Sequence, residues 1–226
     1  MVSADGRWQV RDQFNAPSPN AKIAAVVPCD LDGDGTPELV MADTASRSLL
    51  IQKRSGAVYQ PWKRLRLGAL DLKMLQTADL NGDGKLDLII FGSDALAVSY
   101  AGSDQPRLVE RANYETKLRD ASLADLVAAD LNDDGLADIA LVDTARHFID
   151  IVQVGRDGQL RPALAFQAFE SKSPGGREEA AIEPREILAA DVTGDGRPDL
   201  ILVAHDRVLV YPQDSPEEKS GDKSRR

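Results

Sequence analysis

Oxygen-bearing side chains recur at fixed spacing in four short segments of this chain, and their spacing suits the binding of a hard divalent cation. Each segment has such side chains at positions 1, 3, 5 and 9 and a glycine at position 6. Calcium takes about six to eight oxygen ligands, several of them anionic, around a tight bend of the backbone. Position 7 shares no side-chain chemistry, so we expect its backbone carbonyl to bind the ion. The predicted ligands of up to four calcium ions are Asp30, Asp32, Asp34, Thr36 and Glu38; Asp79, Asn81, Asp83, Lys85 and Asp87; Asp130, Asn132, Asp134, Leu136 and Asp138; and Asp191, Thr193, Asp195, Arg197 and Asp199.

The four loops differ in the ligands that they offer. The first loop has four acids, whereas each of the others has three. In the third loop Asp133 replaces the glycine found at position 4 of the other loops, and this residue either strains the turn or points outward. In the fourth loop Thr193 is an uncharged and weaker ligand. We expect the first and second loops to bind calcium more tightly than the third and fourth.

Helix–loop–helix calcium sites are the main alternative for such a pattern. Those loops need a bidentate glutamate at position 12 and a helix on either side. Position 12 is apolar in all four loops here, being Met41, Ile90, Leu141 and Leu202. Each of these residues lies in an apolar run that is typical of a buried strand. We therefore predict strand–loop–strand sites, although aspartate and glycine also dominate ordinary hairpin turns.

The spacing of the loops predicts a repeat architecture. The loops begin at residues 30, 79, 130 and 191, which gives intervals of 49, 51 and 61 residues. A period of about 50 residues is typical of propeller blades. Each interval contains four strand-like runs, and with the chain ends they predict an all-β propeller of sixteen strands in four four-stranded blades. The expected strands are Trp8–Phe14, Lys22–Val27, Glu38–Asp43, Leu49–Lys53, Tyr59–Leu67, Leu72–Asp79, Asp87–Phe91, Leu96–Tyr100, Arg107–Tyr114, Leu123–Asp130, Asp138–Val142, Phe148–Val154, Arg161–Phe169, Glu186–Asp191, Asp199–Ala204 and Arg207–Tyr211.

The phase of the repeat indicates how a ring of blades would close. If each loop joins the first two strands of a blade, the last blade has only three strands and lacks its fourth. The segment Trp8–Phe14, which precedes the first strand of the first blade, corresponds to such a fourth strand. Pairing of this segment with the last blade would remove exposed sheet edges. A half-propeller that dimerises and a part of a larger propeller are the alternatives. The stretch Lys117–Asp130 also allows a helix, but the repeat phase favours a strand over at least Leu123–Asp130.

Two of the loops resemble a known repeat family. Asp79–Leu88, with the sequence DLNGDGKLDL, and Asp191–Leu200, with the sequence DVTGDGRPDL, are similar to the VCBS/FG-GAP repeat, the calcium-loop blade also found in integrin α-subunit propellers. The resemblance covers roughly residues 8–213. It implies calcium bound at the bottom of a β-propeller and a role in adhesion or ligand recognition outside the cytoplasm. Only Phe91-Gly92 matches the FG element, no GAP segment is present, and propellers of this family usually have more blades.

Much of the acidity of the chain lies in the predicted metal loops. The formal net charge of the 226 residues is −10, and four calcium ions would add +8 and leave −2. This acidity argues against nucleic acid as a partner, because nucleic acid is bound through basic patches. No segment has the features of a signal peptide or a membrane span, so we expect a mature domain or part of a larger exported protein, located outside the cytoplasm.

Three further features complete the expected domain plan. We expect residues 1–213 to form the propeller and residues 214–226 to form a disordered tail, because that tail lacks apolar side chains. The long third interval holds an insertion, Ser171–Pro184, that we expect to be a mobile loop. The single cysteine, Cys29, precludes an internal disulfide, and we expect it to be a small buried core residue.

The sequence shows no catalytic motif. It has no Gly-x-Ser-x-Gly elbow and no phosphate loop, and its two histidines, His147 and His205, lie near turns. We therefore expect a non-enzymatic recognition, adhesion or scaffold module in which calcium makes the loops rigid. A protein or glycan ligand would bind the face opposite the calcium loops, where the polar candidates are Arg47, Arg146, His147 and Arg207. The alternatives are the propeller portion of a calcium-dependent polysaccharide lyase or hydrolase and a structural segment of a larger propeller.

Overall fold

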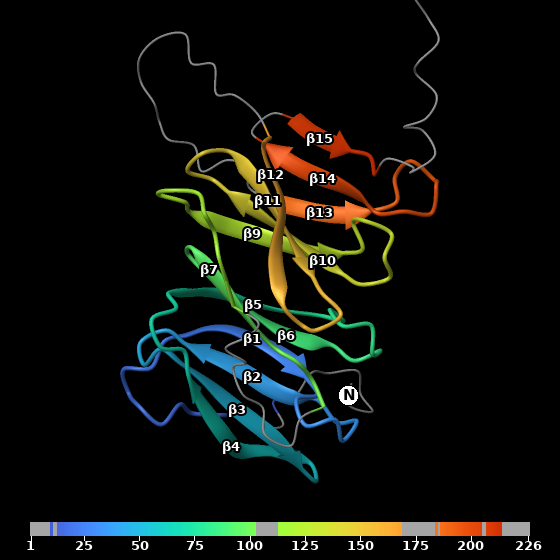
Figure 1. The fold of residues 1–226 in the computed structure, drawn as a ribbon. Coiled ribbons are helices and arrows are strands. Elements are labelled where there is room, and N and C mark those ends of the chain that lie inside the picture. The colour runs from blue at the N-terminus through green and yellow to red at the C-terminus, as the bar shows by residue number, and fades with distance from the viewer. Residues whose placement is uncertain are drawn as a thin grey trace, which may run out of the picture. The chain divides into compact units, whose positions relative to one another are not determined.

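The computed structural model describes residues 10, 13–102, 113–168, 184, 186–204 and 207–213. Within these ranges the chain forms fifteen strands and contains no helix, and hence no helix that could cross a membrane (Figure 1). Apolar and β-branched residues, which suit a pleated and half-buried backbone, fill the strands. The strands are β1 (Ile23–Cys29), β2 (Glu38–Asp43), β3 (Ser48–Ser55), β4 (Val58–Arg66), β5 (Leu72–Ala78), β6 (Asp87–Gly92), β7 (Ala95–Ser99), β8 (Asn113–Glu115), β9 (Leu123–Ala129), β10 (Asp138–Asp143), β11 (Phe148–Val154), β12 (Leu160–Gln167), β13 (Glu186–Ala190), β14 (Asp199–Ala204) and β15 (Arg207–Tyr211).

These strands form four antiparallel sheets in which the strands follow one another in chain order. Three sheets have four strands each, β1 to β4, β5 to β8 and β9 to β12, whereas β13 to β15 form a sheet of three. In every sheet an acidic loop joins the first strand to the second, as the repeat phase predicts. The register is also the same, because position 9 of each loop pairs with the residue just before position 1. These pairs are Cys29 with Glu38, Ala78 with Asp87, Ala129 with Asp138, and Ala190 with Asp199.

The chain divides into two compact units, each with its own hydrophobic core. In the first unit the second and third strands supply Val40 and Ile51 to a buried cluster, and β6 supplies Ile90. In the second unit Val142 and Leu202 belong to a separate buried cluster. The strands β6 and β10 are buried along their whole length, which explains why the sequence shows continuous apolar runs there. The units are Met1–Ala78 with Gly84–Asn113, and Asp79–Asp83 with Tyr114–Arg226.

The predicted strands are confirmed where the structure describes them, with small differences at their ends. The helix considered for Lys117–Asp130 is wrong, because β9 occupies most of its C-terminal half and a turn precedes that strand. The predicted N-terminal strand Trp8–Phe14 falls largely outside the described residues, and Gln13 and Phe14 at its end are not in a strand. The predicted tail, 214–226, and nearly all of the predicted insertion Ser171–Pro184 also lie outside them.

Candidate metal centres

Each acidic loop is folded by hydrogen bonds from its backbone to its own aspartates. In the first loop Asp30 accepts hydrogen bonds of 2.8 Å from the backbone N–H groups of Gly33 and Gly35. Such a turn directs side-chain oxygens inward, which is the arrangement that a chelating loop requires. Equivalent bonds to position 1 run from Gly82 to Asp79 at 2.8 Å, from Gly135 to Asp130 at 2.9 Å and from Gly194 to Asp191 at 2.6 Å.

The turn of each loop depends on left-handed backbone conformations at positions 4 and 6. Position 6 is glycine in all four loops, and its φ lies between 82° and 88°, as the sequence predicts. Position 4 is left-handed as well, and here the third loop is the exception because it has Asp133 with a φ of 64°. Asp133 is exposed, so this loop keeps the common fold while a side chain occupies a conformation that favours glycine.

The acid at position 9 is buried at the base of every loop. This position is the first residue of the second strand, where the pairing with the first strand draws it under the turn. A buried carboxylate is costly unless a cation or hydrogen bonds compensate it. Four such acids in register therefore indicate four places where a cation would be stabilising. Their exposed fractions are 0% for Glu38, 0% for Asp87, 2% for Asp138 and 0% for Asp199.

Two of these buried acids keep one oxygen without a hydrogen-bond partner, namely Oε1 of Glu38 and Oδ1 of Asp138. Burial, with a smaller contribution from the charge of Asp134, raises the pKa of Asp138 to about 6. Burial also raises the pKa of Glu38, and the neighbouring charge of Asp32 adds to this effect, although the backbone N–H of Leu31 partly offsets it. A positive charge close to either of these two carboxylates would therefore be stabilising.

The position 9 acids of the second and fourth loops accept hydrogen bonds from backbone N–H groups. The backbone N–H of Ala101 donates a hydrogen bond of 2.9 Å to Oδ1 of Asp87. Asp199 accepts hydrogen bonds from Val192 at 2.9 Å and from Gln213 at 3.1 Å. Burial alone would raise the pKa of Asp199, but these backbone donors outweigh it, so the pKa lies below its ordinary value.

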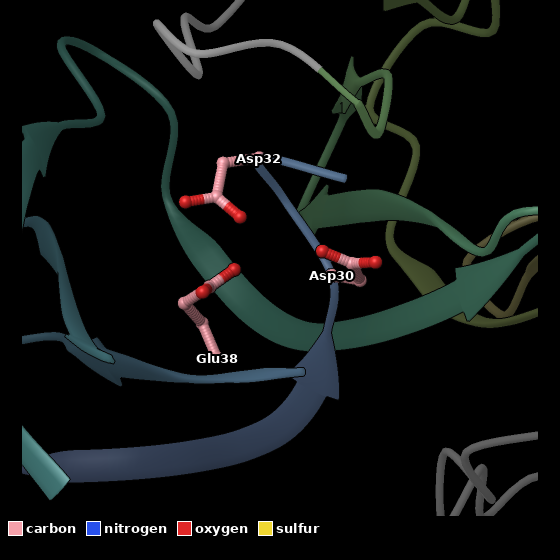
Figure 2. A group of neighbouring side chains, drawn as sticks. All are labelled: Asp30, Asp32 and Glu38. Carbon is pink, nitrogen blue, oxygen red and sulfur yellow. The ribbon is translucent and has the colours of Figure 1, made fainter. Parts of the chain in front are cut away.

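The first loop gathers three carboxylates most closely. One oxygen each from Asp30, Asp32 and Glu38 lies within 4.8 Å of the others. Figure 2 shows the three side chains around a common space, with Glu38 reaching it from the start of β2. This is a donor set that a hard cation prefers, and the predicted ligands Asp34 and Thr36 follow in the same turn. In the described part of the chain no other loop brings three acidic groups this close together.

A cationic side chain, which the motif analysis missed, lies at the first loop. The ammonium of Lys53 forms an ion pair with Asp32, contacts Oδ2 of Asp34 at 2.9 Å and lies 3.7 Å from Oε1 of Glu38. The hydrogen bonds to Asp32 and Asp34 hold the pKa of Lys53 above its ordinary value. The motif covers only the loop itself, whereas Lys53 lies on β3. The one feature of the sequence that could have drawn attention to Lys53 is its place directly after the apolar run of that strand.

The opposite ends of the first and third sheets carry a different aspartate turn. Asp143 accepts a hydrogen bond of 2.6 Å from the backbone N–H of Ser122, and Asp43 accepts one of 2.9 Å from that of Lys22. Two of the residues proposed above for ligand recognition lie in these turns in a left-handed conformation. Their φ values are 47° for Arg47 and 62° for His147. The other candidates are Arg146, whose guanidinium lies 3.6 Å from the exposed carboxylate of Asp120, and Arg207, which begins β15; His205 is outside the described residues.

Cys29 is a buried core residue, as the sequence predicts. It is 2% exposed and its thiol donates a hydrogen bond of 3.1 Å to the carbonyl of Leu86. Burial, with smaller contributions from nearby acids such as Asp87, raises the pKa of the thiol to about 12. A thiol of this kind is a poor nucleophile and a poor metal ligand.

Comparison with known proteins gives a match to one family model and similarity to solved structures. No curated protein matches the chain. A chain in a structure of the Tc holotoxin pore of Photorhabdus luminescens is similar, with 18% sequence identity and a TM-score of 0.48, and the match covers 82% of this chain and 9% of that one. Residues 79–141, which contain the second and third loops, match the family model of the FG-GAP-like repeat. The resemblance inferred from the acidic loops is therefore confirmed, and the chain carries an FG-GAP-like repeat over residues 79–141.

Proposed function

We propose that this chain is a calcium-binding β-repeat module without enzymatic activity, in which calcium fastens the loop between the first two strands of each sheet. The observation that carries the proposal is the buried acid at position 9 of all four loops. Each loop also has oxygen-bearing side chains at positions 1, 3 and 5. A divalent cation would offset both the burial of one carboxylate and the mutual repulsion of the others.

In this proposal the role of calcium is mechanical. The first loop offers Asp30, Asp32 and Glu38 as a converging set, with Asp34 and the carbonyl of Thr36 as additional ligands. The other loops replace one acid by Asn81, Asn132 or Thr193, and each keeps oxygen at all four side-chain positions. The bound ion would tie the loop to the start of the second strand and so hold the edge of each sheet in register.

We place the module outside the cytoplasm and assign it a recognition, adhesion or scaffold role. Calcium sites of extracellular modules have dissociation constants of about 10⁻⁴ to 10⁻³ M, which suits calcium as a permanent structural ion there. The partner would be a protein or a glycan that binds at the sheet ends opposite the loops. Screening of glycan and protein arrays with the calcium-loaded chain tests this part. Turnover of a polysaccharide by the chain would instead support the alternative of a carbohydrate-active enzyme.

We also propose that the N-terminal segment Trp8–Phe14 completes the last sheet. In the described residues that sheet has three strands, and its last strand exposes Val208 at 60% and Val210 at 46%. An added strand would pair with the outer edge of β15 and narrow the exposed surface around these side chains. Deletion of residues 1–14 should therefore lower the unfolding temperature. An unchanged unfolding temperature contradicts this pairing, and a concentration-dependent dimer of the full chain would indicate pairing between two copies or with a larger propeller.

Thermal unfolding in millimolar calcium and in excess chelator tests the metal sites. Millimolar calcium at dissociation constants of about 10⁻⁴ to 10⁻³ M adds about 0.4–1.4 kcal/mol per site to the free energy of unfolding, so several sites together should raise the unfolding temperature measurably. Magnesium serves as a control, because it binds poorly to sites that lack octahedral geometry. An equal unfolding temperature in calcium and in chelator would show that the loops are only turns.

Two neighbouring residues of the third loop provide a matched pair of variants. Asp134 is a predicted ligand at position 5, whereas Asp133 at position 4 is exposed and is not one. Asp134→Asn should reduce the stabilisation by calcium, and Asp133→Asn should leave it nearly intact although it removes the same charge. Equal losses in the two variants would indicate a general charge effect in place of a defined site.

A further inference from the structure

Lys53 distinguishes the first loop from the other three, and the inference below, which concerns how that loop is regulated, rests on the proposed calcium sites. Its ammonium pairs with Asp32 and lies 2.9 Å from Asp34 and 3.7 Å from Glu38. Three of the four acids of the loop therefore already share a cation that the chain itself supplies. The fourth acid, Asp30, accepts hydrogen bonds from the backbone of the turn.

The buried side chain of Glu38 independently indicates that the loop is built around a positive charge. Its Oε2 accepts the backbone N–H of Leu31 at 2.9 Å, but Oε1 is buried and has no hydrogen-bond partner. Figure 2 shows this carboxylate beside those of Asp30 and Asp32. An unpartnered buried oxygen among other carboxylates is stabilised by a cation close to it.

The same place in the other three sheets has no charge. The strand register defines which residues are equivalent to Lys53. Position 10 of each loop pairs with a residue of the third strand, and the equivalent residue is the next one along the chain. In the third sheet this residue is Gln153, and its amide donates a hydrogen bond of 3.2 Å to Asp134, the counterpart of Asp34. The four equivalent residues are Lys53, Tyr100, Gln153 and Pro212.

We infer that Lys53 is the resident cation of the first loop. In the absence of metal its ammonium holds the acids of this loop together, so the loop keeps its fold without calcium. Calcium has to displace the ammonium from Asp32 and Asp34 before it can bind. The first loop is therefore a weaker calcium site than its four acids suggest, and the third loop, which has a similar unpartnered oxygen on Asp138 and no lysine, depends more on the metal.

The surroundings of Lys53 offer a place for the displaced side chain. Its ammonium lies 5.2 Å from the centroid of the Trp62 ring, a face that attracts cations. The ammonium of Lys63 lies over the same ring at 4.3 Å, so the two lysines would compete for it. The displacement by calcium is thus a short movement of a flexible chain, and the loop can exchange one cation for the other without unfolding.

Reciprocal substitutions in the first and third loops test this inference. Each loop contains a glycine whose amide signal reports calcium binding to that loop alone. Calcium chloride is titrated into the full ¹⁵N-labelled chain, and the signals of Gly35 in the first loop and Gly135 in the third loop are followed. In the wild type Gly135 should reach half-saturation at a lower calcium concentration than Gly35. Lys53→Gln should lower the midpoint of Gly35 by about tenfold or more, because it removes a unit charge in contact with the site, and should leave Gly135 unchanged.

Gln153→Lys is the counterpart, since it introduces an ammonium at the equivalent place of the third loop. It should raise the midpoint of Gly135 by about tenfold or more and leave Gly35 unchanged. This variant removes no packing, so it remains informative if Lys53→Gln fails to fold in chelator. Such a failure, if calcium restores the fold, also supports the inference, because calcium then replaces the lost ammonium.

The outcomes separate this inference from the proposed function. If Gly135 responds to calcium and the midpoint of Gly35 changes less than about twofold in Lys53→Gln, then Lys53 is not a competing cation and only this inference is overturned. If no loop glycine responds to calcium in the wild type or in either variant, the loops are not calcium sites. That result overturns the proposed function, and the inference together with it.

Discussion

The phenol of Tyr114 donates a hydrogen bond of 2.7 Å to Oδ2 of Asp150, a carboxylate of β11 that is only 3% exposed. The hydroxyl of Thr116 donates a second hydrogen bond of 2.9 Å to the same oxygen. Burial of the phenol, together with its own hydrogen bond to Asp150, raises the pKa of Tyr114. Asp150 is therefore a buried acid that neutral donors satisfy, unlike Glu38 and Asp138, and it shows that this fold can hold a buried carboxylate without a metal.

Tyr114→Phe should destabilise the chain by about 1.5–3 kcal/mol, the usual range for a hydrogen bond to a charged group. The loss should be the same in calcium and in chelator, because Asp150 lies outside the acidic loops. Urea unfolding curves measured under both conditions give the two values. Thr116→Val is the matched control, and its loss of unfolding free energy should also be the same in calcium and in chelator. A loss that appears only in chelator would mean that this acid, too, interacts with calcium.

Asp138 and Asp199 should respond in opposite ways when each is replaced by asparagine in excess chelator. Oδ1 of Asp138 has no hydrogen-bond partner and burial raises the pKa of this acid, so Asp138→Asn removes a buried charge that is costly without metal and should raise the unfolding temperature. The pKa of Asp199 is lowered because backbone donors favour its charged form, so Asp199→Asn should lower the unfolding temperature. Scanning calorimetry in chelator measures both. Shifts of the same sign would contradict this assignment of the two environments.

In millimolar calcium the two substitutions should no longer differ in sign. Each removes an anionic ligand from a site, so both variants should gain less stability from calcium than the wild type does. If Asp138→Asn gains as much as the wild type, position 9 does not bind the ion in the third loop.

Gly33 and Gly35 provide a test of the loop backbone that does not involve metal ligands. Both have left-handed φ values, 77° and 83°. A Cβ atom on Gly33 would lie 2.9 Å from the Cα of Gly102, whereas a Cβ on Gly35 would have no atom within 4 Å. Gly35→Ala should therefore cost about 1 kcal/mol for the backbone conformation alone. Gly33→Ala should cost at least about 1 kcal/mol more, because the backbone of Gly102 has to move. Equal costs in urea unfolding would show that the contact yields easily.

Asp133→Gly should stabilise the third loop. The other three loops have glycine at this position with φ near that of Asp133, so the substitution removes the strain of a left-handed side chain and keeps the turn. Aspartate tolerates this conformation better than most residues do, which limits the gain to about 1 kcal/mol or less. The reverse change in the fourth loop, Gly194→Asp, should lose a similar amount, because a Cβ there meets no atom within 4 Å. Destabilisation by Asp133→Gly would instead indicate that the aspartate makes a useful contact.

The parts of this fold that could be predicted from the sequence are those that recur. The apolar run after each acidic loop predicted a second strand, and Glu38–Asp43 and Asp199–Ala204 have the predicted bounds. The glycines at position 6 predicted the left-handed turn, because few other residues adopt it at low cost. A pattern that appears four times seldom arises by chance, because every copy has to satisfy the same local geometry.

The parts that could not be predicted are contacts that occur once. Lys53 lies on β3, 21 residues after Asp32, and its approach to the loop depends on strand register that a motif does not contain. The count of acids therefore predicted a high calcium affinity for the first loop without taking Lys53 into account. The bond between Tyr114 and Asp150 spans 36 residues and has no counterpart that would have drawn attention to it. Both contacts come from tertiary packing and not from a local pattern.

For Arg47 and His147, the contribution of the turn backbone to folding has to be separated from a contribution of the side chain to ligand recognition. Each occupies a left-handed turn position, and its carbonyl accepts a hydrogen bond, from Leu67 at 2.9 Å for Arg47 and from Ala168 at 2.8 Å for His147. Both wild-type residues already carry a Cβ in this conformation, so alanine at either position should change the free energy of unfolding little through the backbone. Glycine keeps the turn and removes only the side chain, so Arg47→Gly and His147→Gly should be at least as stable as the wild type. Loss of ligand binding in these glycine variants, at unchanged unfolding temperature, would assign the side chains to recognition. Unchanged binding in both, and in Arg146→Ala, would remove this end of the sheets as the recognition face.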